Sequence, residues 1–191
     1  KPGDHILEIG CGWGGFAEFA ASQGCKVTGL TISREQFDFA TARMEKAGLS
    51  DLVEIKFEDY RDERGTFDHI VSIEMFEAVG EKHWPTYFAT LKNRLKPGGR
   101  AGIQVITINE AAFEPYKSRP DFIQAYVFPG GGIDAPQVRI RCQRRPAGGL
   151  RGSHQFVDLT LPVGGAAEDI GTGHVRVIAG NGRSEVDLHE V

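Results

Sequence analysis

A glycine-rich stretch near the start of the chain has the residue types of a nucleotide-binding turn. Gly10, Gly12, Gly14 and Gly15 directly follow an apolar run. Because glycine lacks a Cβ, the backbone there can adopt positive φ angles and approach a bound ligand closely. Residues 16–21 have helix-forming composition, which places the turn at a helix N-terminus, where backbone N–H groups favour nucleotide-like ligands.

Two ligand classes fit the spacing of these glycines. The pattern Gly10-x-Gly12-x-x-Gly15 satisfies the fingerprint of dinucleotide-binding folds. The overlapping pattern Glu8-x-Gly10-x-Gly12-x-Gly14 is the variant typical of methyltransferases that use S-adenosyl-L-methionine (SAM). The turn by itself therefore leaves both NAD and SAM open.

The end of the second predicted strand favours SAM over NAD. An NAD-binding fold requires Asp or Glu there, about twenty residues beyond the turn, to hold the ribose hydroxyls. Thr31 and Ser33 stand at this strand end, and the first acid, Glu35, already lies in the next helix. Thr31, Ser33 and the amide of Gln36 can still bond a ribose, although neutral partners bind more weakly than a carboxylate. An NAD-dependent oxidoreductase is the less favoured alternative.

A polar cluster that includes Asp59 and Tyr60 follows the third predicted strand. Ligands of doubly wound sheets bind at the carboxyl ends of the strands. A carboxylate there can accept a hydrogen bond from an exocyclic amine, and an adjacent aromatic ring can stack on a base. We therefore expect an adenine site at this pair.

Strand-like and helix-like segments alternate five times along the first part of the chain. Ser33 and Gln36 have the spacing of a capping box, and Pro97-Gly98-Gly99 predicts a turn. This alternation predicts an α/β protein with a Rossmann-like, doubly wound and mostly parallel sheet that is covered on both faces. The expected strands are residues 5–9, 26–32, 52–57, 67–73 and 101–108, and the expected helices are residues 14–23, 33–47 and 81–95.

Composition and charge exclude several classes of protein. The chain has 191 residues, which suits one domain, and its net charge of −4 gives no electrostatic basis for binding nucleic acid. Cys11, Cys25 and Cys142 lack metal-ligand spacing, so we expect reduced thiols and no metal site. No apolar run approaches the roughly twenty residues that cross a bilayer, and residues 1–4 do not form a signal peptide. We therefore expect a cytoplasmic protein; its oligomeric state is not indicated.

The composition changes after residue 132. Residues 133–191 contain seven arginines and no lysine, whereas the residues before them contain eight lysines and seven arginines. We expect a short helix at residues 120–125 and a hairpin at Asn181-Gly182. Short strands are expected at residues 137–142, 154–161, 174–179 and 185–191.

Six motifs occur in one order and at one spacing that together resemble the cyclopropane-fatty-acid synthase family, which includes the mycolic acid cyclopropane synthases. The resemblance covers about residues 3–132. Its motifs are LEIGCGWGGFAEFAA, VTGLTISREQ, EDYRD, FDHIVSIEMFEAVGE, LKPGGRAGIQVITI and YVFPGG.

The resemblance implies that residues 1–132 form a SAM-dependent methyltransferase core. Members of this family add a methylene group across a cis double bond of an unsaturated acyl chain in membrane phospholipid, and related members leave a methyl or methylene branch. Such an enzyme would work at the inner membrane face. The implied SAM contacts are Glu8, Gly10, Gly12 and Gly14 at the turn, Thr31, Ser33 and Gln36 for the ribose and amino-acid parts, and Asp59 and Tyr60 for adenine.

The acceptor chemistry requires a dry, aromatic pocket. An alkene is a weak nucleophile, and methyl transfer leaves an electron-poor carbon that water would trap, so the walls must exclude solvent and offer π faces to positive charge. The candidate wall residues are Phe76, Trp84, Tyr126 and Phe128.

The resemblance also implies a bound bicarbonate that removes a proton from the new methyl group. The positions that match its ligands are Glu77, Gln104 and the backbone amide of Ile106. Gln104 stands where several family members carry His, which changes how the anion is held but keeps a donor.

Two pieces of the family pattern have no counterpart in this sequence: a cysteine-containing helical segment ahead of the glycine turn and a tyrosine motif well after residue 132. Residues 133–191 are expected to be either the product of a shifted reading frame or a small β appendage that replaces the last strands of the family sheet. The alternative to an active enzyme is an inactive remnant that binds SAM.

Overall fold

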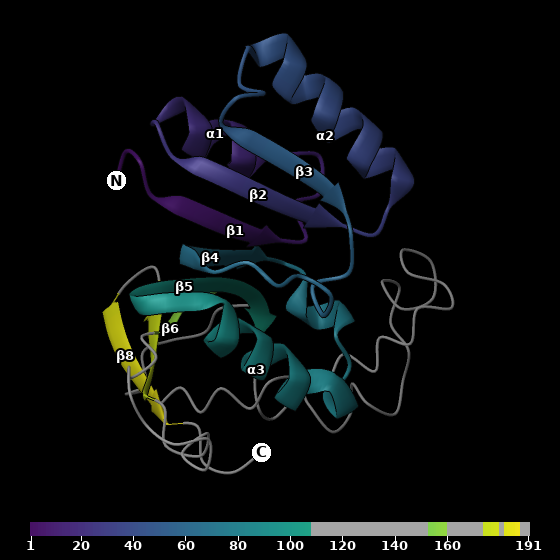
Figure 1. Cartoon of the computed structure of the whole chain (residues 1–191). Helices are drawn as coiled ribbons and strands as arrows, with labels where there is room; N and C mark the ends of the chain where they lie inside the picture. Colours follow the sequence, from purple (N-terminus) through teal and green to yellow (C-terminus); the bar gives the residue numbers. More distant parts are fainter. Residues whose placement is uncertain (108–152, 160–173, 180–181, 188–191) are drawn as a thin grey trace.

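One sheet of eight strands organises the protein, in the order β3-β2-β1-β4-β5-β6-β7-β8 (Figure 1). The computed structural model describes residues 1–107, 153–159, 174–179 and 182–187. The first five strands are mutually parallel, as predicted for a doubly wound α/β fold. They are β1 (His5–Ile9), β2 (Lys26–Thr31), β3 (Val53–Phe57), β4 (Phe67–Ile73) and β5 (Leu95–Thr107).

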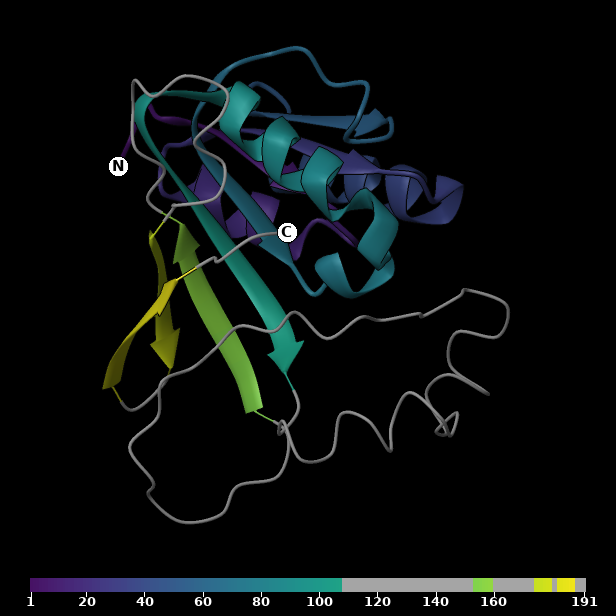
Figure 2. The ribbon, with the colours of Figure 1, turned by 90° about the horizontal axis from the view of Figure 1, so that it is seen from below.

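Helices cover both faces of the parallel strands (Figure 2). The helices α1 (Gly15–Ser22) and α2 (Arg34–Ala47) pack on one face, and α3 (Trp84–Arg94) packs on the other. The strands alternate between these two cores: in β1, Ile6 belongs to the α1/α2 side and Leu7 to the α3 side. Because successive side chains of a strand point to opposite faces, two distinct cores result.

The predicted start of α2 is confirmed at its cap, but only half of the capping box forms. Ser33 is the N-cap residue, and its hydroxyl accepts a hydrogen bond from the backbone N–H of Gln36. The side chain of Gln36 does not return to Ser33; it accepts a bond from the Thr31 hydroxyl, which in turn accepts from the Ser33 N–H. The hydroxyl at the end of β2 therefore takes the place of the reciprocal bond.

The prediction of a turn at Pro97-Gly98-Gly99 is wrong, because these residues lie within β5. The β4–β5 register pairs Phe67 with Leu95 and then His69 with Arg100, so the extra residues of β5 form a bulge. Gly98 supplies a φ of +80° within that bulge. The helix predicted at residues 81–95 starts later than expected. Residues 81–83 form a 3₁₀ turn (η2, Glu81–His83), and α3 begins only at Trp84.

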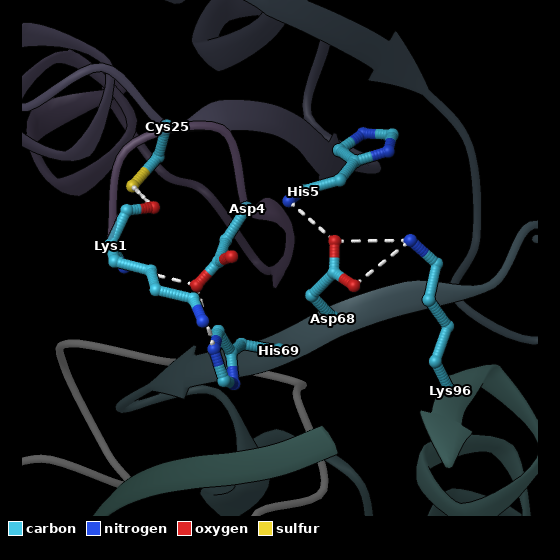
Figure 3. Close-up of polar contacts among 7 residues, drawn as sticks. All are labelled: Lys1, Asp4, His5, Cys25, Asp68, His69 and Lys96. Carbon is cyan, nitrogen blue, oxygen red and sulfur yellow. Dashed lines mark hydrogen bonds and ion pairs between the residues drawn. The ribbon is translucent and has the colours of Figure 1, made fainter. Parts of the chain in front are cut away.

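Polar side chains tie the strands together at their amino ends, opposite the edge that carries the glycine turn (Figure 3). Asp68 accepts the backbone N–H of His5 at 2.9 Å and the Lys96 ammonium at 3.0 Å. His69 Nε2 lies 3.2 Å from a carboxylate oxygen of Asp4. This cluster joins β1, β4 and β5 at one edge and leaves their carboxyl ends to form the site.

Three antiparallel strands continue the sheet beyond β5. They are β6 (Ser153–Leu159), β7 (His174–Ala179) and β8 (Gly182–Asp187). The predicted hairpin is confirmed by the β7–β8 pairing, although β8 starts three residues earlier than expected. The expected segments at residues 120–125 and 137–142, and the expected boundary at residue 132, lie outside the described residues. Within the described ranges, no helix is both long and apolar enough to cross a bilayer.

Candidate functional site

The glycine turn has the backbone that the sequence predicts. Gly10, Gly12 and Gly14 have φ angles of +78°, +53° and +78°. An L-residue in this region is strained by about 1–2 kcal/mol. At Gly14 space is limited as well, because a Cβ would lie 3.1 Å from the Cβ of Ala40 in α2. At Gly12 a Cβ would meet nothing within 4 Å, so the turn is open on that side.

The segment after β4 lies directly against this turn. A Cβ on Gly10 would come within 2.7 Å of Met75 Cγ, so the absence of a side chain permits the approach. Glu74, just before it, has a φ of +52° and is the only non-glycine residue with positive φ among those described. Non-glycine residues in this conformation are uncommon and concentrate at functional sites. The sequence motifs did not single out either Met75 or the Glu74 backbone.

Glu8 lies beneath the turn, at the carboxyl end of β1. Its side chain is 3% exposed, and its Oε2 atom has no hydrogen-bond partner among the described residues. Burial raises its pKa to about 8, while the backbone N–H of Ala17 in α1 acts in the opposite direction. Gly14, the N-cap residue of α1, offers no side-chain oxygen, and Glu8 instead bonds an N–H group of the first turn of this helix, in addition to the first-turn acid Glu18.

The predicted ribose residues form one network at the carboxyl end of β2. The Thr31 hydroxyl donates to the Gln36 amide oxygen at 2.8 Å and accepts from the Ser33 N–H at 3.2 Å. The Ser33 hydroxyl donates to Glu35 at 2.9 Å. The structure thus brings together the three residues that the sequence suggested. Strand β2 is joined to the glycine turn just before Thr31, since the N–H groups of Gly10 and Cys11 both donate to the Leu30 carbonyl.

Asp59 and Tyr60 follow β3, and each has a partner that the sequence did not predict. Both oxygens of Asp59 accept from the Arg61 guanidinium, at 2.8 and 2.7 Å, and this pairing is the main cause that holds the pKa of Asp59 below its ordinary value. The Tyr60 ring meets Tyr87 edge to face, with ring centroids 5.6 Å apart. An adenine at this position would therefore meet a charged pair and one fixed aromatic ring.

An aromatic cluster fills the α3 side of the site. Phe76, in the 3₁₀ turn η1 (Phe76–Ala78), stacks on Trp84 with centroids 5.5 Å apart and packs against Tyr87 at 4.9 Å. All three are buried. Tyr87 was missed in the sequence, although it lies three residues after Trp84 and four before Leu91, which is the spacing of one helix face. Tyr126 and Phe128, the other two predicted wall residues, lie outside the described residues.

The three predicted anion ligands come from neighbouring elements. Glu77 lies in η1, and Gln104 and Ile106 lie in β5. The Gln104 amide donates to the Glu74 carboxylate at 3.2 Å, and the Glu74 N–H donates to the Gln104 carbonyl at 2.9 Å. Glu74 is therefore the acid that Gln104 contacts here. Among the described residues no group of His, Cys, Asp and Glu could hold a metal ion.

Comparisons with known proteins match the part of the chain that contains the five parallel strands. Residues 1–145 match the family model described as mycolic acid cyclopropane synthetase. The chain is 43% identical over 140 residues to tuberculostearic acid methyltransferase of Mycobacterium tuberculosis, covering 73% of this chain and 33% of that protein. It is also 43% identical over 140 residues to cyclopropane-fatty-acyl-phospholipid synthase of Escherichia coli, covering 73% of this chain and 34% of that protein. The chain thus spans about a third of the length of these relatives.

Solved structures agree with the sheet described above. The cyclopropane synthase MmaA2 from Mycobacterium tuberculosis aligns with a TM-score of 0.59 and 26% sequence identity, covering 69% of this chain and 50% of that one. The α/β fold with five parallel strands is therefore shared with a cyclopropane synthase.

Proposed function

Since the chain belongs to the mycolic acid cyclopropane synthetase family, we propose that it is the core of a SAM-dependent enzyme that methylates lipid acyl chains. The substrate we propose is the cis double bond of an unsaturated acyl chain in phospholipid, reached at the cytoplasmic membrane surface. The product would be a cyclopropane or a methyl or methylene branch. The substrate named for one relative, a fatty-acyl phospholipid, supports this choice.

One observation carries the cofactor assignment: the turn that follows β1 has three positive-φ glycines beside a strand end that offers hydroxyl and amide groups. Gly12 leaves open space, and Glu8 keeps an unpartnered carboxyl oxygen beneath the turn. Thr31 and Gln36, with no acid at the end of β2, suit a ribose without the carboxylate that NAD-binding folds require. These features fit SAM better than a dinucleotide.

The residues of this chain would act mainly by binding and by excluding water. SAM supplies the methyl group, which forms a new carbon–carbon bond with one alkene carbon. The ring faces of Phe76 and Trp84, at the carboxyl edge, would stabilise the positive charge that develops on the other carbon. That transfer would break the bond between the methyl carbon and the sulfur of SAM and so leave S-adenosylhomocysteine. Loss of a proton from the new methyl group would then close the ring.

The base for that proton remains a prediction. Glu77 belongs to the turn that supplies Phe76, which places a carboxyl group close to the aromatic cluster. Gln104, proposed to hold bicarbonate with Glu77 and the Ile106 amide, has its amide on Glu74 in this structure. We therefore propose Glu77, in place of bicarbonate, as the group to test first.

The test uses the 191-residue chain, SAM with a labelled methyl group, and vesicles of phospholipid with cis-unsaturated acyl chains. We expect label in the acyl chains and a mass gain of one CH₂ group for a cyclopropane or methylene product. Vesicles of the saturated phospholipid are the matched control and should stay unlabelled. The variant Glu77→Gln should still bind SAM but transfer methyl at least about tenfold more slowly, as expected for loss of general base catalysis.

Calorimetry with SAM separates this proposal from its alternative. SAM binding without any transfer to either lipid would support an inactive SAM-binding remnant, whereas binding of NAD in place of SAM would overturn both. Transfer to unsaturated lipid alone would establish the proposed activity for this portion of the family sequence.

A further inference from the structure

Glu8 is an acid held in an apolar setting at the base of the proposed SAM turn. It is 3% exposed, and in β1 it pairs in register with Gly29 of β2 and Val71 of β4. A Cβ on Gly29 would meet Cys11 at 3.0 Å, so the thiol of the turn fills the space above that glycine. The carboxyl group therefore shares a closed space with a thiol and small or aliphatic residues.

Among the residues that the structure describes, no cation influences the titration of Glu8. The titratable groups on the surrounding elements include Cys11 in the turn, Glu18 in α1 and Arg43 in α2. Glu18 and Arg43 are paired with each other and about one third exposed, and neither contributes to the titration of Glu8. Burial and then the Glu8 carboxyl raise the pKa of Cys11 to about 12, so this thiol is neutral. An ionised Glu8 would have only the Ala17 N–H to favour it.

The second carboxyl oxygen of Glu8 lacks a hydrogen-bond donor among the described residues of the structure. This atom, Oε2, is fully enclosed, and a buried polar atom of this kind is unfavourable unless it finds a partner. SAM carries a positive sulfonium and an α-ammonium group, and the ammonium is a hydrogen-bond donor. The turn that ends β1 is where this amino-acid part would lie, next to the helix N-terminus that Glu8 faces.

We propose that Glu8 keeps its proton in the cofactor-free protein and loses it when SAM binds, so that cofactor binding is coupled to proton release. This inference rests on the proposed function, because it takes SAM as the ligand of the turn. The ammonium group of SAM, bound at the turn, supplies the nearby positive charge that the buried carboxylate lacks. The proton passes to the solvent buffer, and no other group changes its charge.

Calorimetry in two buffers of different ionisation enthalpy measures this proton directly. At pH 7 we expect close to one proton released for each SAM bound, and the same for S-adenosylhomocysteine, which keeps the ammonium. Methylthioadenosine lacks the amino-acid part and should bind without proton release. Below about pH 8, where free Glu8 is protonated, SAM affinity should fall about tenfold for each unit of pH decrease, as linkage of one proton requires.

Two variants test the residue. Glu8→Gln preserves the shape of the protonated acid and should bind SAM more weakly, with no proton exchange and a flat pH profile. Glu18→Gln removes a solvent-accessible acid from the same region and should keep the proton release. Equal heats in both buffers for the unmodified protein, or unchanged release in Glu8→Gln, would overturn the inference while leaving the proposed function intact. Absence of any SAM binding would instead overturn the cofactor assignment, and this inference with it.

Discussion

The two faces of the sheet are packed in different ways. On the α1/α2 face, half of the eight buried core residues have small side chains, which are Ala17, Ala20, Ala21 and Cys25. We call this core the alanine layer. On the α3 face the core is built around large aromatic rings, which are Phe67, Phe76, Trp84 and Tyr87. We call this core the aromatic layer. The difference follows the two parts of the site, because the glycine turn enters the first layer and the proposed acceptor pocket borders the second.

Small residues allow a close approach, and this is what the glycine turn requires. Gly14 packs against Ala40 and Met44 of α2, and Ala17 of α1 is fully buried. Rings provide bulk and π faces, which suits a layer that borders a lipid chain and a developing cation. The two layers should therefore fail in opposite ways: the alanine layer when side chains grow, and the aromatic layer when they shrink.

The largest loss should come from emptying the aromatic layer. Phe76 is 3% exposed and contacts the rings of Trp84, Tyr87 and Phe88. Replacement of Phe76 by Ala leaves a cavity and should reduce the free energy of unfolding by about 3–5 kcal/mol. Denaturant unfolding measures the change. The control is Phe19→Ala, since Phe19 is 65% exposed and its truncation should change stability by no more than about 0.5 kcal/mol. Equal losses at the two positions would contradict the comparison.

The second effect concerns the acid of the alanine layer and depends on pH. The pKa of Glu8 is raised from 4.5 to about 8 in the folded protein, so the folded state binds more protons than the unfolded state between these values. Stability contributed by this group therefore falls as pH rises from about 4.5 to 8, by a few kcal/mol in total at about 1.4 kcal/mol for each pKa unit.

The measurement compares unfolding free energies of the unmodified protein and Glu8→Gln across that pH range. The variant should lack the decline, so its stability relative to the unmodified protein should increase toward pH 8. Parallel pH profiles would show that Glu8 is solvated or paired in the folded state, and the α1/α2 layer would then contain no isolated acid.

A smaller loss is expected from enlarging the alanine layer. Ala17 is fully buried in α1 against the sheet, and replacement by Leu inserts a larger side chain where the helix lies close to the strands. We expect a loss of about 1–3 kcal/mol from overpacking. Ala42 in α2 is exposed, so Ala42→Leu is the matched control and should have almost no effect. An unchanged melting temperature for Ala17→Leu would show that this layer has spare volume.

The features that were predictable from sequence are those set by local chemistry. β4 occupies the predicted residues 67–73, because this stretch is rich in apolar residues and begins just after the turn residue Gly65. The Ser33 cap and the positive φ angles of the glycine turn were also predictable, since each follows from the residue type at one position. Thr31, Ser33 and Gln36 form one hydrogen-bond network, which their spacing within six residues of chain makes possible; their role in binding stays a prediction.

Contacts between distant segments could not be read in this way. Gln104 and Glu74 meet only because β4 and β5 are neighbours in the sheet, and the positive φ of Glu74 depends on how its segment passes the glycine turn. The bulge in β5 likewise results from its register with β4. The pairing of Asp59 with Arg61 is local, but it competes with the binding role predicted for that carboxylate, and the residue types alone do not reveal such competition.

The smallest expected effect is the most specific test of the aromatic layer. Tyr87 is fully buried, and its hydroxyl has no hydrogen-bond partner among the described residues. The Ser72 hydroxyl lies near enough to lower the pKa of Tyr87 slightly against the dominant effect of burial, but the two do not form a hydrogen bond of normal geometry. Removal of an unpartnered hydroxyl relieves its desolvation, so Tyr87→Phe should leave stability unchanged or raise it by up to about 1 kcal/mol. Ser72→Ala should behave in the same way, and the double variant should add the two effects.

A loss of more than about 1 kcal/mol in Tyr87→Phe would mean that the hydroxyl is hydrogen-bonded in solution. In that case the aromatic layer would contain a hydrogen-bonded polar group beside the proposed acceptor pocket. It would then differ from the alanine layer in polarity as well as in the size of its side chains.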